Sequence, residues 1–219
     1  MAIKENIKEI LSSIPKSVTL VAVSKTKPEN DLLEAYDAGQ KVFGENKIQE
    51  MTQKWENLPK DIEWHMIGHV QTNKVKYMAE FVSLVHGVDS PKLLKEINKQ
   101  AKKHNRIIPC LLQMHIAEED TKFGLDQTEL RDVLSSETFR NLHNVQVVGL
   151  MGMATFTDDK NQIRREFKQL KILFDRLKET LPEIHTLSMG MSGDYKIAIE
   201  EGSTMIRIGS GIFGERNYK

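Results

Sequence analysis

The sequence predicts a (β/α)8 barrel, an α/β fold in which eight parallel strands alternate with helices. Helical patterns separate short apolar runs, and these runs are apolar on both faces, as in parallel strands that helices cover. The runs recur along the 219 residues at 18–23, 41–43, 63–67, 81–85, 107–113, 145–150, 185–187 and 205–208. A doubly wound open sheet would share this pattern, but about eight units in this length favour the closed barrel.

The helices are predicted from their apolar stripes and from the residues at their ends. The first residues follow helical spacing among charged ones, which predicts an extra N-terminal helix within 1–14, packed on the barrel, rather than a signal peptide. Further helices are predicted at 29–38, before Gly39, at 90–103 and at 160–180. Because no linker or low-complexity tract interrupts the chain, we expect 1–219 to form a single domain.

Composition excludes several classes of function. Basic and acidic residues balance at 31 each, so no net charge attracts nucleic acid or an anionic membrane. Cys110 is the only cysteine, which rules out a disulfide within the chain and favours a reducing compartment. No apolar run is long enough to cross a bilayer. We therefore expect a soluble, cytoplasmic protein that is a monomer and binds neither nucleic acid nor membrane.

A lysine follows the first predicted strand. Alternation along the strand places Val21, Val23 and Lys25 on one face, toward the barrel interior. Burial and repulsion from Lys27 would both lower the pKa of Lys25, which favours a neutral amine of the kind that forms Schiff bases with aldehydes. The alternative is a strand-end lysine whose amine reaches solvent.

Loops rich in glycine and serine follow the last two strands. In such barrels the active face lies at the C-terminal ends of the strands, and the last two loops commonly bind phosphate. Residues 188–194 read Ser-Met-Gly-Met-Ser-Gly-Asp before a helix predicted at 195–201, and residues 206–214 contain the second loop. Each loop alone also fits an ordinary turn. Their combination with Lys25 favours a phosphate site.

Other polar residues fall near the same end of the barrel. Arg207 interrupts an apolar strand, so we expect it to point into the barrel, either beside a ligand ring or in an ion pair. His65 and His69 are four residues apart, but they lack a nearby third ligand, so no metal site is predicted. Lys122 lies in the fifth loop, either as a solvated lysine or as part of the site.

Five motifs, read together, resemble those of one known family. They are Val21-Ala22-Val23-Ser24-Lys25-Thr26, Phe43-Gly44-Glu45-Asn46, the run from Trp64 to Lys74, Ser188-Met189-Gly190-Met191-Ser192, and the run from Arg207 to Gly214. In this order they are similar to the pyridoxal phosphate homeostasis protein family, from about Val18 to Gly214. The resemblance implies a fold-type III TIM barrel, as in the N-terminal domain of alanine racemase and in bacterial-type ornithine decarboxylase.

The resemblance also implies roles for individual residues. Lys25 would form the Schiff base with pyridoxal 5′-phosphate, and Arg207 would face the pyridine nitrogen. The phosphate would be held by Ser192, Gly209 and Ser210, and the cofactor would be lined by Asn46, Ser188 and Met189. Lys47 and the pair Met114-His115 depart from the family's usual residues, which puts only the outer pocket in doubt.

These residues suit binding better than turnover. Arginine stays protonated, so Arg207 can donate a hydrogen bond to the ring nitrogen but cannot make it a pyridinium, which leaves the cofactor a poorer electron sink. Related racemases add a tyrosine from a second domain, which we expect to be missing because the chain stops at Lys219. We therefore predict a non-catalytic carrier that releases pyridoxal phosphate to apo-enzymes, with Lys27 and Lys122 as candidate secondary acceptors.

Two alternatives stay open at this point. The first is an amino-acid racemase or decarboxylase of fold type III, with His65 or a tyrosine as the opposing acid. The second is a barrel for another phosphorylated small molecule, in which Lys25 would serve only as a counter-charge to the phosphate.

Overall fold

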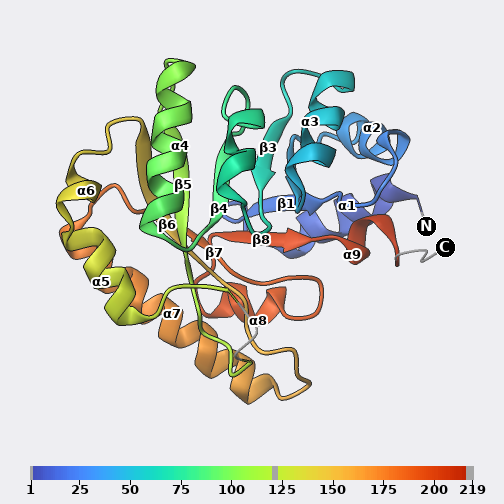
Figure 1. The fold of residues 1–219 in the computed structure, drawn as a ribbon. Helices are drawn as coiled ribbons and strands as arrows, with labels where there is room; N and C mark the ends of the chain where they lie inside the picture. Colours follow the sequence, from blue (N-terminus) through green and yellow to red (C-terminus); the bar gives the residue numbers. More distant parts are fainter. Residues whose placement is uncertain (1, 120–122, 216–219) are drawn as a thin grey trace.

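The computed structural model describes residues 2–119 and 123–215 and contains a closed barrel of eight parallel strands (Figure 1). Each strand pairs with the next along the chain, and the last pairs with the first. The strands are β1 (Thr19–Val23), β2 (Val42–Glu45), β3 (Glu63–Met66), β4 (Leu84–Val88), β5 (Ile108–Met114), β6 (Val145–Gly152), β7 (Thr186–Ser188) and β8 (Met205–Ile208). The predicted (β/α)8 TIM barrel is confirmed.

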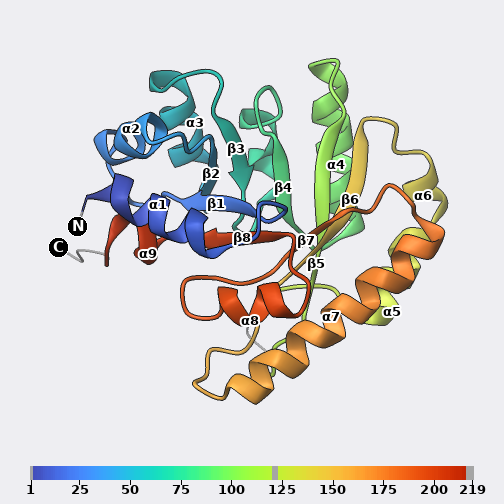
Figure 2. The same ribbon diagram turned by 180° about the vertical axis from the view of Figure 1, so that it is seen from behind.

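Helices cover the outside of the barrel (Figure 2). The described α-helices are α1 (Ile3–Ser13), α2 (Glu29–Asp37), α3 (Ile48–Asn57), α4 (Pro91–Lys103), α5 (Gln127–Ser135), α6 (Glu137–Arg140), α7 (Lys160–Thr180), α8 (Tyr195–Glu200) and α9 (Ser210–Phe213), and a 3-10 helix, η1, spans Thr72–Tyr77. Helix α1 packs against α2 and α9, so the first helix lies beside the last. In the part of the chain that the structure describes, no helix combines the length and apolar character that a membrane span requires.

Strand β4 lies three residues later than the sequence predicts. The apolar run 81–85 suggested its position, but Phe81 stacks on Trp55 of α3, with ring centroids 4.4 Å apart. Val82 is buried in the core between strands and helices, and Phe81 is partly buried against that core, so both residues pack inward without joining a strand. The shift carries β4 on to Val88 and places His86 inside the strand.

The core has two layers. The larger layer lies between the strands and the helices, and it includes Leu20 and Ala22 of β1. The barrel interior holds a smaller apolar cluster formed by Val21, Leu84, Leu111, Val148, Met151 and Met205. Along β4 and β8, each inward apolar residue is followed two positions later by a polar one, His86 and Arg207. The interior therefore becomes polar toward the C-terminal ends of the strands.

Candidate ligand-binding site

A cavity of about 580 Å³ opens at the C-terminal end of the barrel. It is lined by six of the residues that the sequence predicts for the cofactor: Lys25, Asn46, Ser192, Arg207, Gly209 and Ser210. These residues come from both ends of the chain. They meet because β8 closes the barrel against β1, with Val21 opposite Arg207.

Lys25 is carried by a tight turn after β1. The N–H of Lys27 donates to the carbonyl of Ser24 at 3.1 Å, which makes Lys25 and Thr26 the central residues of a β-turn. The side chain of Lys25 is partly buried and lines the cavity beside Val23. This is the face that alternation from the inward residue Val21 predicts.

Arg207 is held on β8 by oxygens of β7 and β6. Its side chain is almost fully buried, at 3 % exposure. Nη1 donates to the carbonyl of Ser188 at 3.0 Å and to its Oγ at 2.5 Å, and Nη2 donates to the carbonyl of Gly152 at 3.2 Å. Desolvation by burial lowers the pKa of Arg207 to about 10. The guanidinium is therefore still protonated at neutral pH, and it can donate into the cavity.

Ser188 and Met189 do not line this cavity, in contrast to the expectation for both. Ser188 is fully buried and faces the barrel interior, where its hydroxyl meets Arg207. Met189 is fully buried in the layer between strands and helices. The side chains of Ser188 and Met189 point in opposite directions because consecutive residues of an extended chain alternate between its two faces. Ser188 thus contacts Arg207, which does line the cavity.

Two buried histidines extend this chain of contacts. Ser188 Oγ lies 3.0 Å from His86 Nδ1, and His86 Nε2 lies 3.0 Å from His65 Nδ1. Burial lowers the pKa of His65 to about 3, and burial, with repulsion between protonated His86 and its neighbours His65 and Arg207, lowers the pKa of His86 well below 6.5. Both rings are neutral at pH 7. Since arginine only donates, the Ser188 hydroxyl accepts from Arg207 and can donate to the neutral ring of His86.

Sequence reasoning missed His86. The predicted strand ended at Val85, so His86 was not assigned a direction. Alternation from Leu84 is the signal that places it in the interior, because residues two apart on a strand share a face.

The loops after β7 and β8 form another wall of the cavity. Ser192 and Gly193 come from the first loop, and Gly209 and Ser210 come from the second. The helix predicted after the first loop is α8, which is followed by Gly202 at φ +94°. A Cβ atom on Gly209 would lie 3.3 Å from the backbone oxygen of Val23, so the backbone after β8 and that of β1 approach closely there. Both loops therefore bring hydroxyl and backbone N–H groups to the same cavity.

Lys27 also lines the cavity, but its amine binds backbone carbonyls. Nζ donates to the carbonyls of Phe213 at 2.8 Å, Gly214 at 3.2 Å and Glu215 at 3.2 Å, at the end of α9 and just after it. These bonds join the Lys25 turn to the loop after β8. A role for Lys27 as a secondary acceptor would require breaking them and stays a prediction. Lys122 lies outside the described residues.

A buried ion cluster lies behind the Lys25 turn. Lys54 of α3 is 5 % exposed and donates to Glu45 Oε1 at 2.7 Å, to Glu50 Oε1 at 2.7 Å and to the carbonyl of Ser24 at 2.8 Å. Ser24 Oγ donates to the same oxygen of Glu45 at 2.6 Å. Desolvation raises the pKa of the fully buried Glu45, and the charge of Lys54 opposes that rise. Sequence reasoning did not foresee this cluster.

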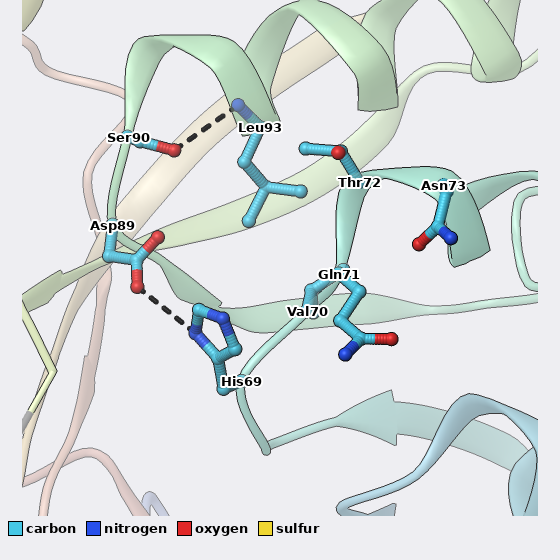
Figure 3. A pocket seen from close by; sticks show the side chains of 8 residues that line it. All are labelled: His69, Val70, Gln71, Thr72, Asn73, Asp89, Ser90 and Leu93. Atoms are coloured by element: carbon cyan, nitrogen blue, oxygen red, sulfur yellow. Dashed lines mark hydrogen bonds and ion pairs between the residues drawn. The ribbon is translucent and has the colours of Figure 1, made fainter.

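A second cavity, of about 440 Å³, lies beside the residues that follow β3 and β4 (Figure 3). In this view His69 points at Asp89, and Nδ1 and Oδ2 are 3.3 Å apart. Ser90 Oγ accepts from the N–H of Leu93 and so caps α4. The rest of the lining is Val70, Gln71, Thr72 and Asn73.

His65 and His69 do not share a site. His65 contacts His86 inside the barrel, whereas His69 pairs with Asp89 at the second cavity. Among residues 2–119 and 123–215, no group of three or more histidine, cysteine, aspartate or glutamate side chains is placed to hold a metal ion.

Comparisons with known proteins identify similar sequences over the whole chain. The profile of the family described as "Alanine racemase, N-terminal domain" matches residues 1–217. Pyridoxal phosphate homeostasis proteins are also similar. The one from Vibrio alginolyticus is 40 % identical over 99 % of both chains. The one from Aquifex aeolicus is 42 % identical over 91 % of this chain and 87 % of its own.

Solved structures with the same barrel are also similar. PipY of Synechococcus elongatus, solved with pyridoxal phosphate bound, has a TM-score of 0.88 and 35 % identity, and the match covers 97 % of this chain and 100 % of PipY. Alanine racemase from Bartonella henselae has a TM-score of 0.71 at 16 % identity and covers 99 % of this chain and 60 % of the racemase. The second likeness shows the fold alone.

Proposed function

This chain belongs to the pyridoxal phosphate homeostasis protein family, and on that basis we propose that it binds pyridoxal 5′-phosphate through Lys25 and carries it to apo-enzymes. The observation that carries the proposal is the cavity at the end of the barrel. There Lys25 and Arg207 share one space with Ser192 and Ser210 of the glycine-rich loops. Similarity to PipY, solved with this cofactor bound, supports the choice of ligand.

The groups in the cavity fit this cofactor. It supplies an aldehyde, which condenses with a neutral lysine amine and releases one water. Lys25 lines the cavity, and Arg207 has guanidinium donors that suit a ring nitrogen. Ser192, Gly209 and Ser210 offer hydroxyl and backbone donors to a phosphate. The cavity, at about 580 Å³, is of the size that small-molecule sites have.

The state of Arg207 favours a carrier over an enzyme. With a pKa of about 10, Arg207 keeps its proton at neutral pH, and Ser188 and Gly152 fix its orientation. It therefore donates a hydrogen bond to a ring nitrogen without protonating it, which limits electron withdrawal by the ring. We accordingly propose a non-catalytic carrier, monomeric and cytoplasmic, that meets its apo-enzymes transiently, rather than a racemase or decarboxylase.

Pyridoxal phosphate is expected to form an adduct on Lys25 that borohydride reduces. Absorbance titration of the wild type, followed by reduction and peptide mass mapping, locates the modified residue. Lys25→Ala should lose the adduct and most of the affinity, because only the phosphate and ring contacts remain. Lys16→Ala, which removes an exposed lysine before β1, is the matched control. Binding without an adduct on Lys25 would instead indicate a site for another phosphorylated small molecule.

The loaded protein is expected to reactivate an apo-enzyme without catalysing proton exchange. Reactivation is measured with a phosphatase present that destroys free cofactor. Any reactivation then observed comes from direct transfer between the two proteins. Exchange at the α-carbon of amino acids is measured in heavy water, with Lys25→Ala as the control. Lysine-dependent exchange at enzymatic rates would contradict the non-catalytic proposal, and reactivation that the phosphatase abolishes would contradict direct transfer.

A further inference from the structure

Thr26, next to Lys25, has a backbone conformation that threonine disfavours. Its φ is +64°, in the left-handed region, and it occupies the third position of the turn 24–27. A positive φ at that position favours glycine, and a β-branched residue there is a steric outlier. Such strain persists only where surrounding contacts hold it, and it gathers at functional sites.

The contacts that hold this turn fall on the residues flanking Lys25. The N–H of Thr26 donates to Glu50 Oε1 at 2.6 Å. Ser24 is held at three atoms: its N–H donates to the Gly44 carbonyl at 3.0 Å, its hydroxyl donates to Glu45, and its carbonyl accepts from Lys54. The backbone is thus fixed on both sides of Lys25.

The Glu50 carboxylate that accepts from Thr26 is itself held in place. Glu50 Oε1 accepts from Lys54 as well as from Thr26, and the two charged residues are one helical turn apart on α3. The ammonium group of Lys54 donates to Glu50, to Glu45 and to the Ser24 carbonyl, which uses its three N–H groups. Neither Glu50 nor Lys54 lines the cavity among the described residues. Their contact with the site therefore runs through the backbone of the turn.

We propose that Glu50 and Lys54 are positioning residues that hold Thr26 in its left-handed conformation and so direct the Lys25 amine into the cavity before the cofactor arrives. The inference rests on the proposed function, in which Lys25 reacts with the cofactor. If the turn relaxed, only a fraction of molecules would present the amine, and the apparent affinity would fall by that fraction.

The test compares Glu50→Ala, Thr26→Gly and the double variant with the wild type. Glu50→Ala should lower the affinity for pyridoxal phosphate and the rate of adduct formation about tenfold, the order expected for loss of a hydrogen bond to a charged group. Thr26→Gly in the same chain should restore most of that loss, because glycine adopts a positive φ without strain. Glu56→Ala, which removes an exposed carboxylate from the same helix, should change neither quantity.

Binding of pyridoxine 5′-phosphate, which lacks the aldehyde, distinguishes a misplaced Lys25 amine from a general loss of the binding site. Its affinity should be the same in all variants, since it tests only the phosphate and ring contacts. If Glu50→Ala does not fold, Glu50→Gln is used in its place. Its affinity for pyridoxal phosphate and its rate of adduct formation should fall less, and Thr26→Gly should again reverse the fall. Adduct formation unaffected by loss of Glu50, or a loss that Thr26→Gly leaves unchanged, overturns the inference. A wild type without a Lys25 adduct overturns the proposed function instead.

Discussion

Replacing Lys54 with methionine is expected to lower the free energy of unfolding by about 3–5 kcal/mol, the cost of leaving a buried charge without its partner. Glu45 is fully buried, and Lys54 lies 2.7 Å from its Oε1. Desolvation already raises the pKa of Glu45, and removal of Lys54 would raise it further. Denaturation with urea at pH 7 measures the loss.

Two variants separate this explanation from a general effect of losing a lysine. Lys41→Met removes an exposed ion pair with Asp61 and should cost little stability, because solvent screens exposed pairs. Lys54→Met combined with Glu45→Gln should recover much of the loss, because no buried charge remains. The destabilisation of Lys54→Met should also shrink as the pH falls, since a carboxyl with a raised pKa favours the folded state when it is protonated. A loss as small as that of Lys41→Met would contradict the prediction.

Acid is expected to destabilise the protein steeply through His65 and His86. In the folded state, burial lowers the pKa of His65 to about 3 and that of His86 well below 6.5. In the unfolded chain both take up protons near pH 6.5. Below that pH the unfolded state binds more protons than the folded state, so the free energy of unfolding falls with the pH. The expected slope is about 1.4 kcal/mol per pH unit for each histidine, continuing toward pH 3 for His65.

The experiment follows urea denaturation between pH 6.5 and pH 5, above the range where most carboxylates take up protons. A variant with both His65→Asn and His86→Asn keeps hydrogen-bonding side chains but loses the titration, so its stability should vary much less with pH. His104→Asn removes an exposed histidine at the end of α4 and should leave the slope as in the wild type. A wild-type stability that stays level over this interval would contradict the assignment of both rings as neutral.

Much of the barrel is predictable because its pattern is local. Strand β8 spans Met205–Ile208 and helix α7 spans Lys160–Thr180, both as predicted. In each, the spacing of apolar residues along a short stretch determines the element and its buried face. Strand β4 was displaced because aromatic stacking of Phe81 on Trp55 provides burial that a strand would otherwise supply. That contact joins separate elements, and periodicity within one segment does not report it.

The direction of Lys25 was likewise predictable from alternation, and so was the gathering of Arg207 with the glycine-rich loops, given the order of strands in a barrel. The exclusion of Met189 from the cavity follows from the same alternation, but only once the end of β7 at Ser188 is known. The resemblance to a family named residues around the cofactor, and the structure adds which of them line the cavity.

By itself, the sequence determined the barrel, the end of it at which the cavity opens and the side on which Lys25 lies, because these follow from periodicity and strand order. Only the tertiary structure decided that Ser188 meets Arg207 and His86, that Lys54 joins Glu45 and Glu50, and that Thr26 is held in a left-handed conformation. Hydrogen bonds and ion pairs require atoms within about 3 Å, and closure of the barrel is what brings residues of different strands and helices to that distance.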